Sequence, residues 1–493
     1  MHSTSLFSFP RQDFVAGTVV FLIALPLCLG IAIACGVPPV SGLVAGVVGG
    51  LVVPLWSRSP LSVTGPAAGL TSIVLLEVQR LGGVEPFLTA VAMAGVLQLF
   101  FGVLRLGRFS ALVPASVIKG MLAAIGITIV LKQLPVALGV EGGLRAIAGG
   151  FHAGASLITA VSLILLYGWK RTPFAKVAIL PAALIVVILA SMLAEFFSGT
   201  SLGLETRHFV NIPLGGFEGL VSAIPRPDFS VMGSGDVWVA AFTIAIVASI
   251  ETLLSCQAVD RLDPLKRHTP PDRELVAQGA ANAISGVLGG LPVTAVIVRS
   301  GANVAAGGRE RLSAMVHGFW LLLAVLFMGP LLNRIPLACL AAVLVQVGLN
   351  LCKPALFAEQ KRLGLAQFLP FALTITAVLT TDLLKGVIVG IVLGVVVVLH
   401  QYIRGALDKS VSSDGTVRLR FRRDATFLVK PALMSELDDL DDDTKVIIDG
   451  SGEYVDQDIK EALVAFLEDA HSRRIQASVV GIDLAGARAG GGH

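Results

Sequence analysis

The sequence predicts a polytopic α-helical membrane protein followed by a small cytoplasmic α/β domain. Of its 493 residues, 55% are apolar and only 14% are charged, and the mean hydropathy is +0.82. Soluble globular chains carry about 25% charged residues, so this chain has too little polar surface to cover a soluble core of its size. Its apolar residues fall into windows of about 16 to 24 residues, the length that a helix needs to cross a hydrocarbon layer of roughly 30 Å.

Fourteen apolar windows follow one another between short polar breaks. They lie at 14–34, 41–56, 62–77, 86–104, 113–134, 154–169, 177–196, 236–258, 274–289, 292–306, 312–332, 335–352, 366–381 and 384–402. The third window of each group of seven, 62–77 and 292–306, is short and interrupted by Gly and Pro. Paired broken segments in matching halves indicate an inverted-repeat transporter with a binding site near the middle of the bilayer. Because each half has an odd number of segments, the two repeats are inverted.

The orientation follows from the Lys and Arg residues between the windows. Most of them lie on the cytoplasmic side if the N-terminus is cytoplasmic, as expected because positive residues resist translocation. An even number of crossings then places the C-terminus in the cytoplasm as well. Residues 1–12 are polar, and no small-residue cleavage site follows the first window, so we expect that window to remain in the membrane.

The composition changes after residue 402, which predicts a transmembrane domain over 1–408 and a soluble domain over 409–484. Apolar residues alternate with arginines over 417–421, as in a half-buried strand. The predicted order is β, α, β, α, β, with the later elements at 445–449 (strand), 456–473 (helix) and 477–482 (strand). Residues 485–493 are rich in Gly and Ala and are expected to be disordered.

Composition and motifs argue against several classes of function. The net charge is only +3 and no basic stripe is present, so we expect no nucleic-acid partner. The five cysteines and eight histidines show no metal-ligand spacing, and the sequence has no GxSxG, HExxH or phosphate-loop motif. We therefore expect neither an enzyme nor a metal or cofactor site.

The two broken segments supply the candidate substrate-binding residues. The N-terminal ends of half-helices expose unpaired backbone N–H groups with positive dipole character, so two such ends that face each other would form an anion site. The candidates at these ends are Gly65, Pro66, Ala67 and Ala68 in the third segment and Val298, Arg299 and Ser300 in the tenth. The alternative is that the small residues only allow close packing of helices.

Glu251 is the only carboxylate well inside any of the fourteen windows, where ionisable side chains are costly and usually functional. We interpret it as a coupling group that carries a proton or a cation. Arg299 lies about two turns from the start of its half-helix, a place that the helix dipole disfavours, so we expect an anionic neighbour. That neighbour is either the substrate or Glu251, and in the second case a permanent ion pair only braces the core.

Several motifs follow one another in the order and spacing of a known transporter family. They are Asp13 and Gly17 with Ala24-Leu25-Pro26 and Gly36-Val37-Pro38-Pro39, then Thr64-Gly65-Pro66-Ala67-Ala68-Gly69, Ile250-Glu251-Thr252-Leu253-Leu254, Arg273-Glu274-Leu275 with Gln278, Gly279 and Asn282, Gly289-Gly290-Leu291-Pro292, and Arg299-Ser300 with Asn303. Together they resemble the SulP (sulfate permease) family of anion transporters, and the C-terminal domain resembles the STAS module of that family. The resemblance implies a core domain of segments 1–4 and 8–11, a gate domain of segments 5–7 and 12–14, and a homodimer.

The same resemblance implies the kind of transport. Sulfate, bicarbonate and dicarboxylates such as fumarate are substrates within the family, so we expect a secondary active transporter of a small anion that works by alternating access. The short STAS segment indicates a bacterial protein of the inner (plasma) membrane. Glu251, with Ser255 one turn later, stands where some sodium-coupled relatives have Asp and Thr. We therefore predict symport with a proton, with sodium as the alternative.

Two other interpretations fit the sequence. A nucleobase permease shares the seven-plus-seven architecture, although its tenth segment usually carries an acid where this chain has Val298 and Arg299. An uncoupled anion channel, or a non-transporting sensor that uses the STAS domain for interaction, also satisfies the pattern of spans.

Overall fold

The computed structural model describes most of the chain, namely residues 8–108, 113–140, 143–169, 181–212, 222–381 and 383–484. The tail at 485–493, which the sequence predicts to be disordered, lies outside these residues. The chain divides into two compact units, Met1–Ile391 and Val392–His493. Each unit has a hydrophobic core of its own.

The first unit is helical, and each of the fourteen predicted windows contains a helix. The helices up to the middle of the chain are α1 (Pro10–Ala34), α2 (Pro39–Leu51), α3 (Val53–Trp56), α4 (Thr71–Arg80), α5 (Val84–Val103), α6 (Ala115–Ala137), α7 (Ala153–Gly168) and α8 (Ala182–Phe196). The later ones are α10 (Gly235–Leu262), α11 (Pro271–Val287), α12 (Ile297–Ala305), α13 (Leu312–Phe327), α14 (Gly329–Leu332), α15 (Leu337–Leu351), α16 (Pro354–Arg362), α17 (Leu365–Thr380) and α18 (Leu383–Arg404). Short 3-10 turns lie at Ala68–Leu70 (η1), Leu144–Gly149 (η3), Thr206–His208 (η6) and Phe229–Gly233 (η7).

Among the described residues, seven helical segments are long and apolar enough to cross a membrane. The prediction of a multi-pass membrane protein is therefore confirmed, whereas the count of fourteen spans stays a prediction. The helix α16 was not predicted, because its sequence is polar and lies between two apolar windows.

The two predicted broken segments begin as strands and then turn into short helices. The strand β1 (Thr64–Pro66) leads through η1 into α4, and β2 (Val293–Ala295) leads into α12. The strands pair antiparallel, with Gly65 opposite Thr294. Proline lacks a backbone N–H and glycine disfavours helix, so the Gly-Pro and Gly-Gly-Leu-Pro sequences favour an interruption at these points of the two spans. The pairing brings the starts of α4 and α12 to the same two-stranded sheet.

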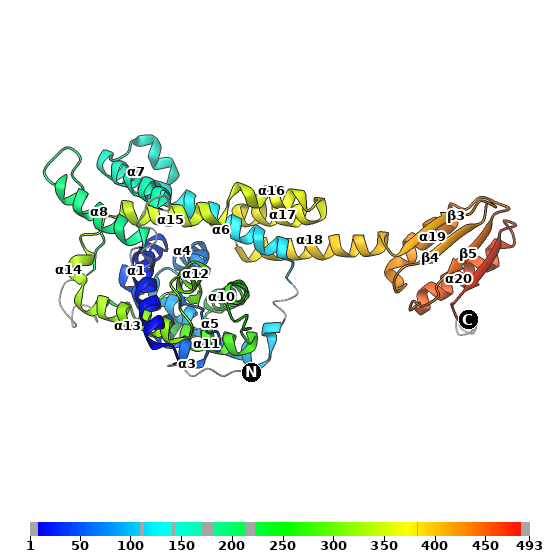
Figure 1. Cartoon of the computed structure of the whole chain (residues 1–493), viewed down its shortest axis with the longest axis horizontal. Coiled ribbons are helices and arrows are strands. Elements are labelled where there is room, and N and C mark those ends of the chain that lie inside the picture. The colour runs from blue at the N-terminus through cyan, green and yellow to red at the C-terminus, as the bar shows by residue number, and fades with distance from the viewer. Residues whose placement is uncertain are drawn as a thin grey trace. The chain divides into compact units, whose positions relative to one another are not determined.

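The helices of the first unit pack in three groups (Figure 1). The helix α5 packs against α10 and α11, α1 packs against α2 and α13, and α6 packs against α15 and α17. The first two groups contain segments that the sequence assigns to the core domain, and the third contains segments assigned to the gate domain. The division into two moving domains stays a prediction.

Glycines allow the closest of these contacts. A Cβ atom on Gly279 of α11 would lie 2.6 Å from the backbone nitrogen of Leu99 in α5, and one on Gly95 would overlap the backbone nitrogen of Ala283. Small residues at helix contacts let backbones approach within a membrane, so α5 and α11 are packed tightly behind the two-stranded sheet.

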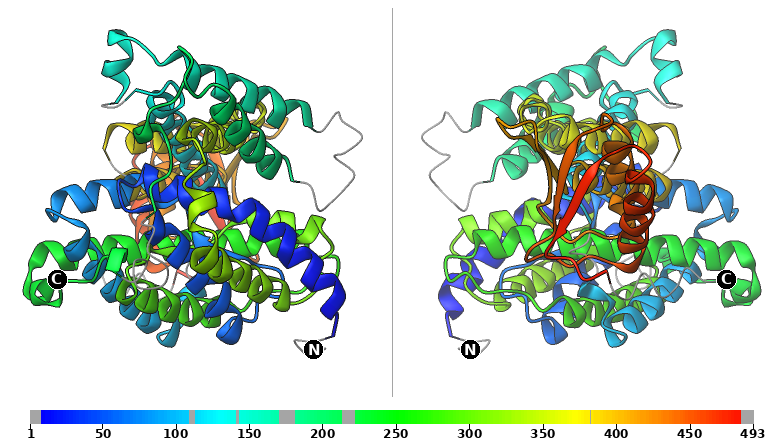
Figure 2. Two further views of the ribbon diagram at one scale, coloured as in Figure 1. Left: turned by 90° about the vertical axis from the view of Figure 1, so that its left-hand side faces the viewer. Right: turned by 90° about the vertical axis from the view of Figure 1, so that its right-hand side faces the viewer.

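The second unit is an α/β domain with a four-stranded sheet of order β3-β4-β5-β6 (Figure 2). Its elements are β3 (Leu407–Val411), β4 (Val417–Phe421), η8 (Phe427–Val429), α19 (Lys430–Asp438), β5 (Lys445–Asp449), α20 (Gln457–Ala470) and β6 (Gln476–Val480). The strands β3 and β4 are antiparallel, and β4, β5 and β6 are parallel. In β4 the apolar side chains are buried and both arginines are exposed, so the two helices cover one face of the sheet.

One prediction for this unit is wrong. The sequence-based order starts with the strand at 417–421, but β3 precedes it, and the predicted boundary between 408 and 409 falls inside β3. The strand β3 was missed because its sequence, LDKSV, shows no apolar alternation and most of its residues are exposed at the sheet edge. The strands at 445–449 and near 477–482 and the helix near 456–473 were predicted correctly. The identification as a STAS domain stays a prediction.

A buried row of amide side chains on α11 fixes the two-stranded sheet from behind. The Asn282 side chain donates to Val293 O over 3.0 Å and accepts from Val293 N over 2.6 Å, so it satisfies both backbone groups of one β2 residue. One turn earlier, Gln278 Nε2 donates to Thr64 Oγ1 of β1 over 2.9 Å and to Glu274 Oε1 over 3.0 Å. Buried backbone groups without partners are costly, so this row holds both strands in place.

We predict that Asn282→Ala destabilises the protein by about 1–3 kcal/mol, because both Val293 backbone groups lose a buried partner. The measurement is the melting temperature of the detergent-solubilised protein. Asn350→Ala, which changes an exposed residue of α15, is the matched control and should leave the melting temperature unchanged. Equal melting temperatures for all three proteins would show that the strands do not depend on Asn282.

Candidate functional site

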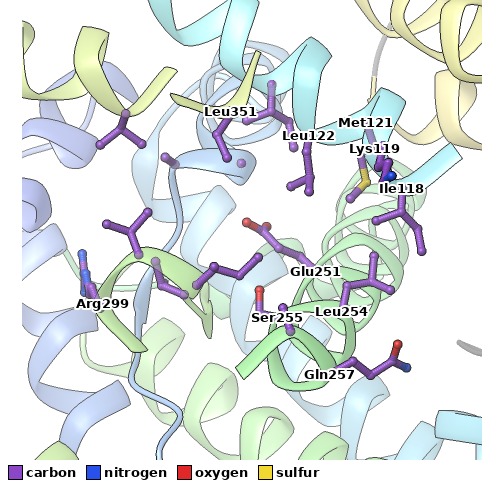
Figure 3. Close-up of a pocket in the computed structure, with 18 of the residues that line it drawn as sticks. Ile118, Lys119, Met121, Leu122, Glu251, Leu254, Ser255, Gln257, Arg299 and Leu351 are labelled. Carbon is purple, nitrogen blue, oxygen red and sulfur yellow. The ribbon is translucent and has the colours of Figure 1, made fainter. Parts of the chain in front are cut away.

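A cavity of about 220 Å³ lies where both broken segments meet the helices α1, α6, α10 and α15 (Figure 3). Its walls include Ala68 and Gly69 of η1 and Val296, Ile297 and Val298 at the start of α12. The cavity therefore touches the beginnings of both half-helices. The remaining wall comes mainly from α6 and α10, and the α6 and α15 residues in it are apolar except for Lys119.

The starts of the two half-helices give the cavity a positive character. The first backbone N–H groups of a helix have no partner within the helix, and the aligned peptide dipoles place partial positive charge there. Ile297 and Val298 are the first two residues of α12, and Gly69 lies in the turn that opens α4. These backbone groups border the cavity, which makes them suited to an anion.

Glu251 enters the cavity from α10 (Figure 3). Its Oε2 atom is buried and has no hydrogen-bond partner among the described residues. The carboxyl group lies directly against Gly69, where a Cβ atom would be 2.5 Å from Glu251 Oε1. An acidic group with an unpartnered oxygen beside a positive helix start is placed to respond to protonation and to the arrival of an anion.

Arg299 lies apart from Glu251, as Figure 3 shows. Its side chain is fully buried, and Nη2 donates to Pro66 O of β1 over 3.3 Å. Among the described residues no ion pair joins Arg299 to Glu251, and Arg299 Nε and Nη1 have no hydrogen-bond partner. The hypothesis of a permanent Glu251–Arg299 pair is therefore wrong, because the guanidinium faces the β1 backbone. A Cβ atom on Gly65 would overlap Arg299 Nη1, so glycine makes room for the guanidinium.

Three buried side chains on one face of α12 hold the backbone of the other broken segment. Besides the Arg299 bond to β1, Ser300 Oγ accepts from Val63 N over 2.9 Å. Asn303 Nδ2 donates to Leu61 O over 3.0 Å. Each of these bonds satisfies a backbone group of the interrupted span, and together they tie α12 to the segment that leads into α4.

The residues that the sequence predicts to bind substrate fall into two sets in the structure, those that line the cavity and those that lie behind its wall. Ala68, Val298 and Arg299 are among the residues that line the cavity. Gly65, Pro66, Ala67 and Ser300 are buried in or beside the paired strands and support the cavity wall.

Sequence reasoning missed the side of the cavity that α6 and α15 form. Leu122 and Ile125 of α6 and Leu351 of α15 face Glu251 across the space. The only signal for them is the spacing of apolar residues along α6, which is also typical of ordinary packing.

A buried polar cluster closes one end of the bundle near the last turn of α10. Arg267 donates to Asp263 Oδ2 over 2.7 Å and to Glu310 Oε1 over 2.8 Å. Asp13, in the first turn of α1, accepts from the backbone of Arg309 and Glu310 over 2.7 and 3.0 Å. Burial raises the pKa of Asp263, but the hydrogen bonds from Arg267 outweigh it and hold this pKa below its usual value. The Asp263–Arg267 pair therefore stays charged, and the cluster joins the ends of α1 and α10.

Comparison with known proteins identifies the family. Residues 11–374 match the model of the Sulfate permease family. The chain belongs to this family. Because its relatives are named as transporters, the prediction of a transporter and not an enzyme is confirmed.

Two relatives show the extent of the similarity. A Bacillus subtilis (strain 168) protein named "Putative sulfate transporter YvdB" is 30% identical over 397 residues, which cover 76% of this chain and 71% of that protein. "Bicarbonate transporter BicA" of Picosynechococcus sp. is 28% identical over 358 residues, which cover 69% of this chain and 62% of that protein.

Two solved structures share the fold of this sulfate permease family member. The transmembrane domain of a cyanobacterial bicarbonate transporter BicA aligns with a TM-score of 0.66 at 24% identity, over 78% of this chain and 98% of that chain. The structure of SLC26A9 aligns with a TM-score of 0.76 at 16% identity, over 97% of this chain and 86% of that chain. The prediction of a helical membrane transporter fold is confirmed.

We predict that Gly69→Ala impairs transport, because the added methyl group would displace the Glu251 carboxyl group. If displacing the carboxyl group costs about 1–3 kcal/mol, as is typical of overpacking, uptake of a labelled anion into proteoliposomes should fall by about fivefold or more. Gly301→Ala in α12 is the matched control, since no atom lies within 4 Å of its added Cβ. Uptake by Gly69→Ala equal to that of the control would contradict the tight contact with Glu251.

Proposed function

We propose that the chain is a secondary active transporter of a small anion, and that the anion binds in the cavity between the starts of α4 and α12. The observation that carries this proposal is the meeting of two half-helix starts and one carboxyl group in a single cavity. Sulfate and bicarbonate are the first candidate substrates, because relatives are named for them. A dicarboxylate such as fumarate is the third. Membership of the sulfate permease family favours an anion over a nucleobase.

The cavity suits alternating access because helices of the predicted core domain and of the predicted gate domain both border it. The broken segments, α1 and α10 form one side, and α6 and α15 form the other. Residues that line it near the end of α10, such as Gln257 and Arg261, are exposed, whereas Gly69 is buried. The mouth therefore lies at the end of the bundle that holds Asp13, which the distribution of Lys and Arg assigns to the cytoplasm. On this assignment the protein is in an inward-facing state.

The cost of moving charge across the membrane is the reason to propose that Glu251 couples anion transport to a proton. Moving one net charge across the membrane costs about 2.3 kcal/mol per 100 mV, so an anion enters a negative cell more easily with a proton. Protonated Glu251 would neutralise one charge of the loaded core, and its unpartnered oxygen is free to take up a proton. The family resemblance places Glu251 where some sodium-coupled relatives have Asp, which favours the proton over sodium.

Arg299 has a supporting role in this proposal. It holds β1 through Pro66 and adds a buried positive charge behind the helix starts. The C-terminal unit, as a STAS domain in the cytoplasm, would regulate transport without contributing to the substrate site. We also propose that two copies form a homodimer with one pathway in each.

We predict that Glu251→Gln abolishes anion accumulation driven by an inward proton gradient but retains anion exchange, because the amide cannot carry the coupled proton. The measurement is uptake of radiolabelled sulfate and bicarbonate into proteoliposomes, with imposed proton or sodium gradients. Glu195→Gln, at an exposed position near the end of α8, is the control and should accumulate the anion normally.

Normal proton-driven accumulation by Glu251→Gln would contradict the coupling role. Accumulation that follows only the sodium gradient would replace the proton with sodium. Passive equilibration by the unchanged protein under every gradient would indicate an uncoupled channel.

A further inference from the structure

A second, much smaller cavity lies beside the first one. Its volume is about 10 Å³, which is roughly the space of one water molecule. Thr71 and Ser72 of α4 and Thr128, Lys132 and Gln133 of α6 supply its polar wall. These side chains give the small cavity three kinds of hydrogen-bond donor, namely hydroxyl, ammonium and amide groups, around a space that is now almost closed.

The two cavities share a wall. Ala68 of η1 and Ile125 of α6 are among the residues that line both of them. The large cavity uses the N-terminal half of α6, from Ala115 to Ile125, and the small one uses the C-terminal half, from Ile125 to Gln133. The Ala68–Ile125 contact region therefore separates two spaces that follow one helix.

One face of α6 runs through both cavities. Lys119, Leu122 and Ile125 line the large cavity, and Ile125, Ile129 and Lys132 line the small one. These positions are three or four residues apart, which places them on the same side of a helix. Thirteen residues of helix span about 20 Å, so this face covers most of the hydrocarbon thickness.

Lys132 has an environment that packing alone does not explain. Among the described residues no ion pair is formed by its ammonium group, whereas Lys119 at the other end of the same face pairs with Glu359 over 2.9 Å. Lys132 is partly buried beside hydroxyl and amide side chains. A simple interfacial anchor would extend its ammonium group into the polar headgroup region and would not line a polar cavity.

We propose that the small cavity is the closed outer half of the transport pathway, and that Lys132, with Ser72 and Thr71, binds the anion when this half opens. This inference rests on the proposed function. Withdrawal of α6 from η1 would separate Ile125 from Ala68 and join the two cavities. Thr71, whose Oγ1 donates to Ala68 O over 2.8 Å, and Ser72 would then line the joined space. The sites reached from the two sides would thus differ, with Lys132 serving only the outer one.

The test compares transport from the two sides of the membrane, with radiolabelled sulfate and bicarbonate as probes. Lys132→Met should raise the KM for the external anion by about tenfold, the loss expected for one charge-assisted hydrogen bond, and leave the KM for efflux unchanged. Lys132→Arg should restore most of the external affinity. The unchanged efflux KM also shows that the variant is folded. Arg334→Met, which removes an exposed positive charge just before α15, should change neither KM.

A labelling experiment that needs no substrate keeps the two proposals distinguishable. In a variant with its five cysteines replaced, Ser72→Cys should react with an impermeant thiol reagent added outside cells, and Gln257→Cys should react only from inside. If Lys132→Met transports the anion with an unchanged external KM, or if Ser72→Cys is not labelled from outside, the inference about the outer half is overturned and the proposed function still stands. External labelling of Ser72→Cys in a protein that transports neither anion would uphold the outer opening and overturn the proposed function for these substrates.

Discussion

The architecture depends on one constraint, that an interrupted helix at membrane depth must have its backbone polar groups satisfied by protein. Hydrocarbon offers no hydrogen bonds, so the two broken spans are stable only because they satisfy each other. The strands β1 and β2 pair directly. Asn282 and Gln278 bond them from α11, and Arg299, Ser300 and Asn303 bond the segment around β1 from α12. All five side chains are fully buried, so they serve the fold before they serve a substrate.

This bonding leaves the starts of the half-helices free to face a cavity. The positive character of that cavity comes from backbone groups, while the buried Arg299 guanidinium is turned toward β1. The electrostatic field at the helix starts attracts small anions of different shapes. The apolar residues of α6 and α15 then limit the size of the anion that fits the cavity. Glu251, pressed against Gly69, adds a titratable charge at the same place. The proposed mechanism therefore couples binding and protonation within one cavity.

Much of this arrangement could be predicted from the sequence, because hydropathy, proline and glycine act locally. The helical windows, the two interruptions and the isolated acid at Glu251 follow from composition and spacing. The direction of the Arg299 side chain could not be predicted, because it depends on the room that Gly65 leaves in a segment more than two hundred residues away. The cavity wall on α6 was missed for the same reason, since its residues resemble any packed helix face. The strand β3 was missed because an exposed edge strand carries no apolar alternation.

The most direct test of the central claim is to locate a bound anion. Crystals of the protein grown with selenate, whose selenium scatters anomalously, would give the anion position independently of any assumption about coupling. We predict an anomalous peak in the cavity between the starts of the two half-helices, within about 3–4 Å of the backbone amide of Ile297 or Val298. A peak beside the Arg299 guanidinium behind β1, with none between the two helix starts, would contradict it.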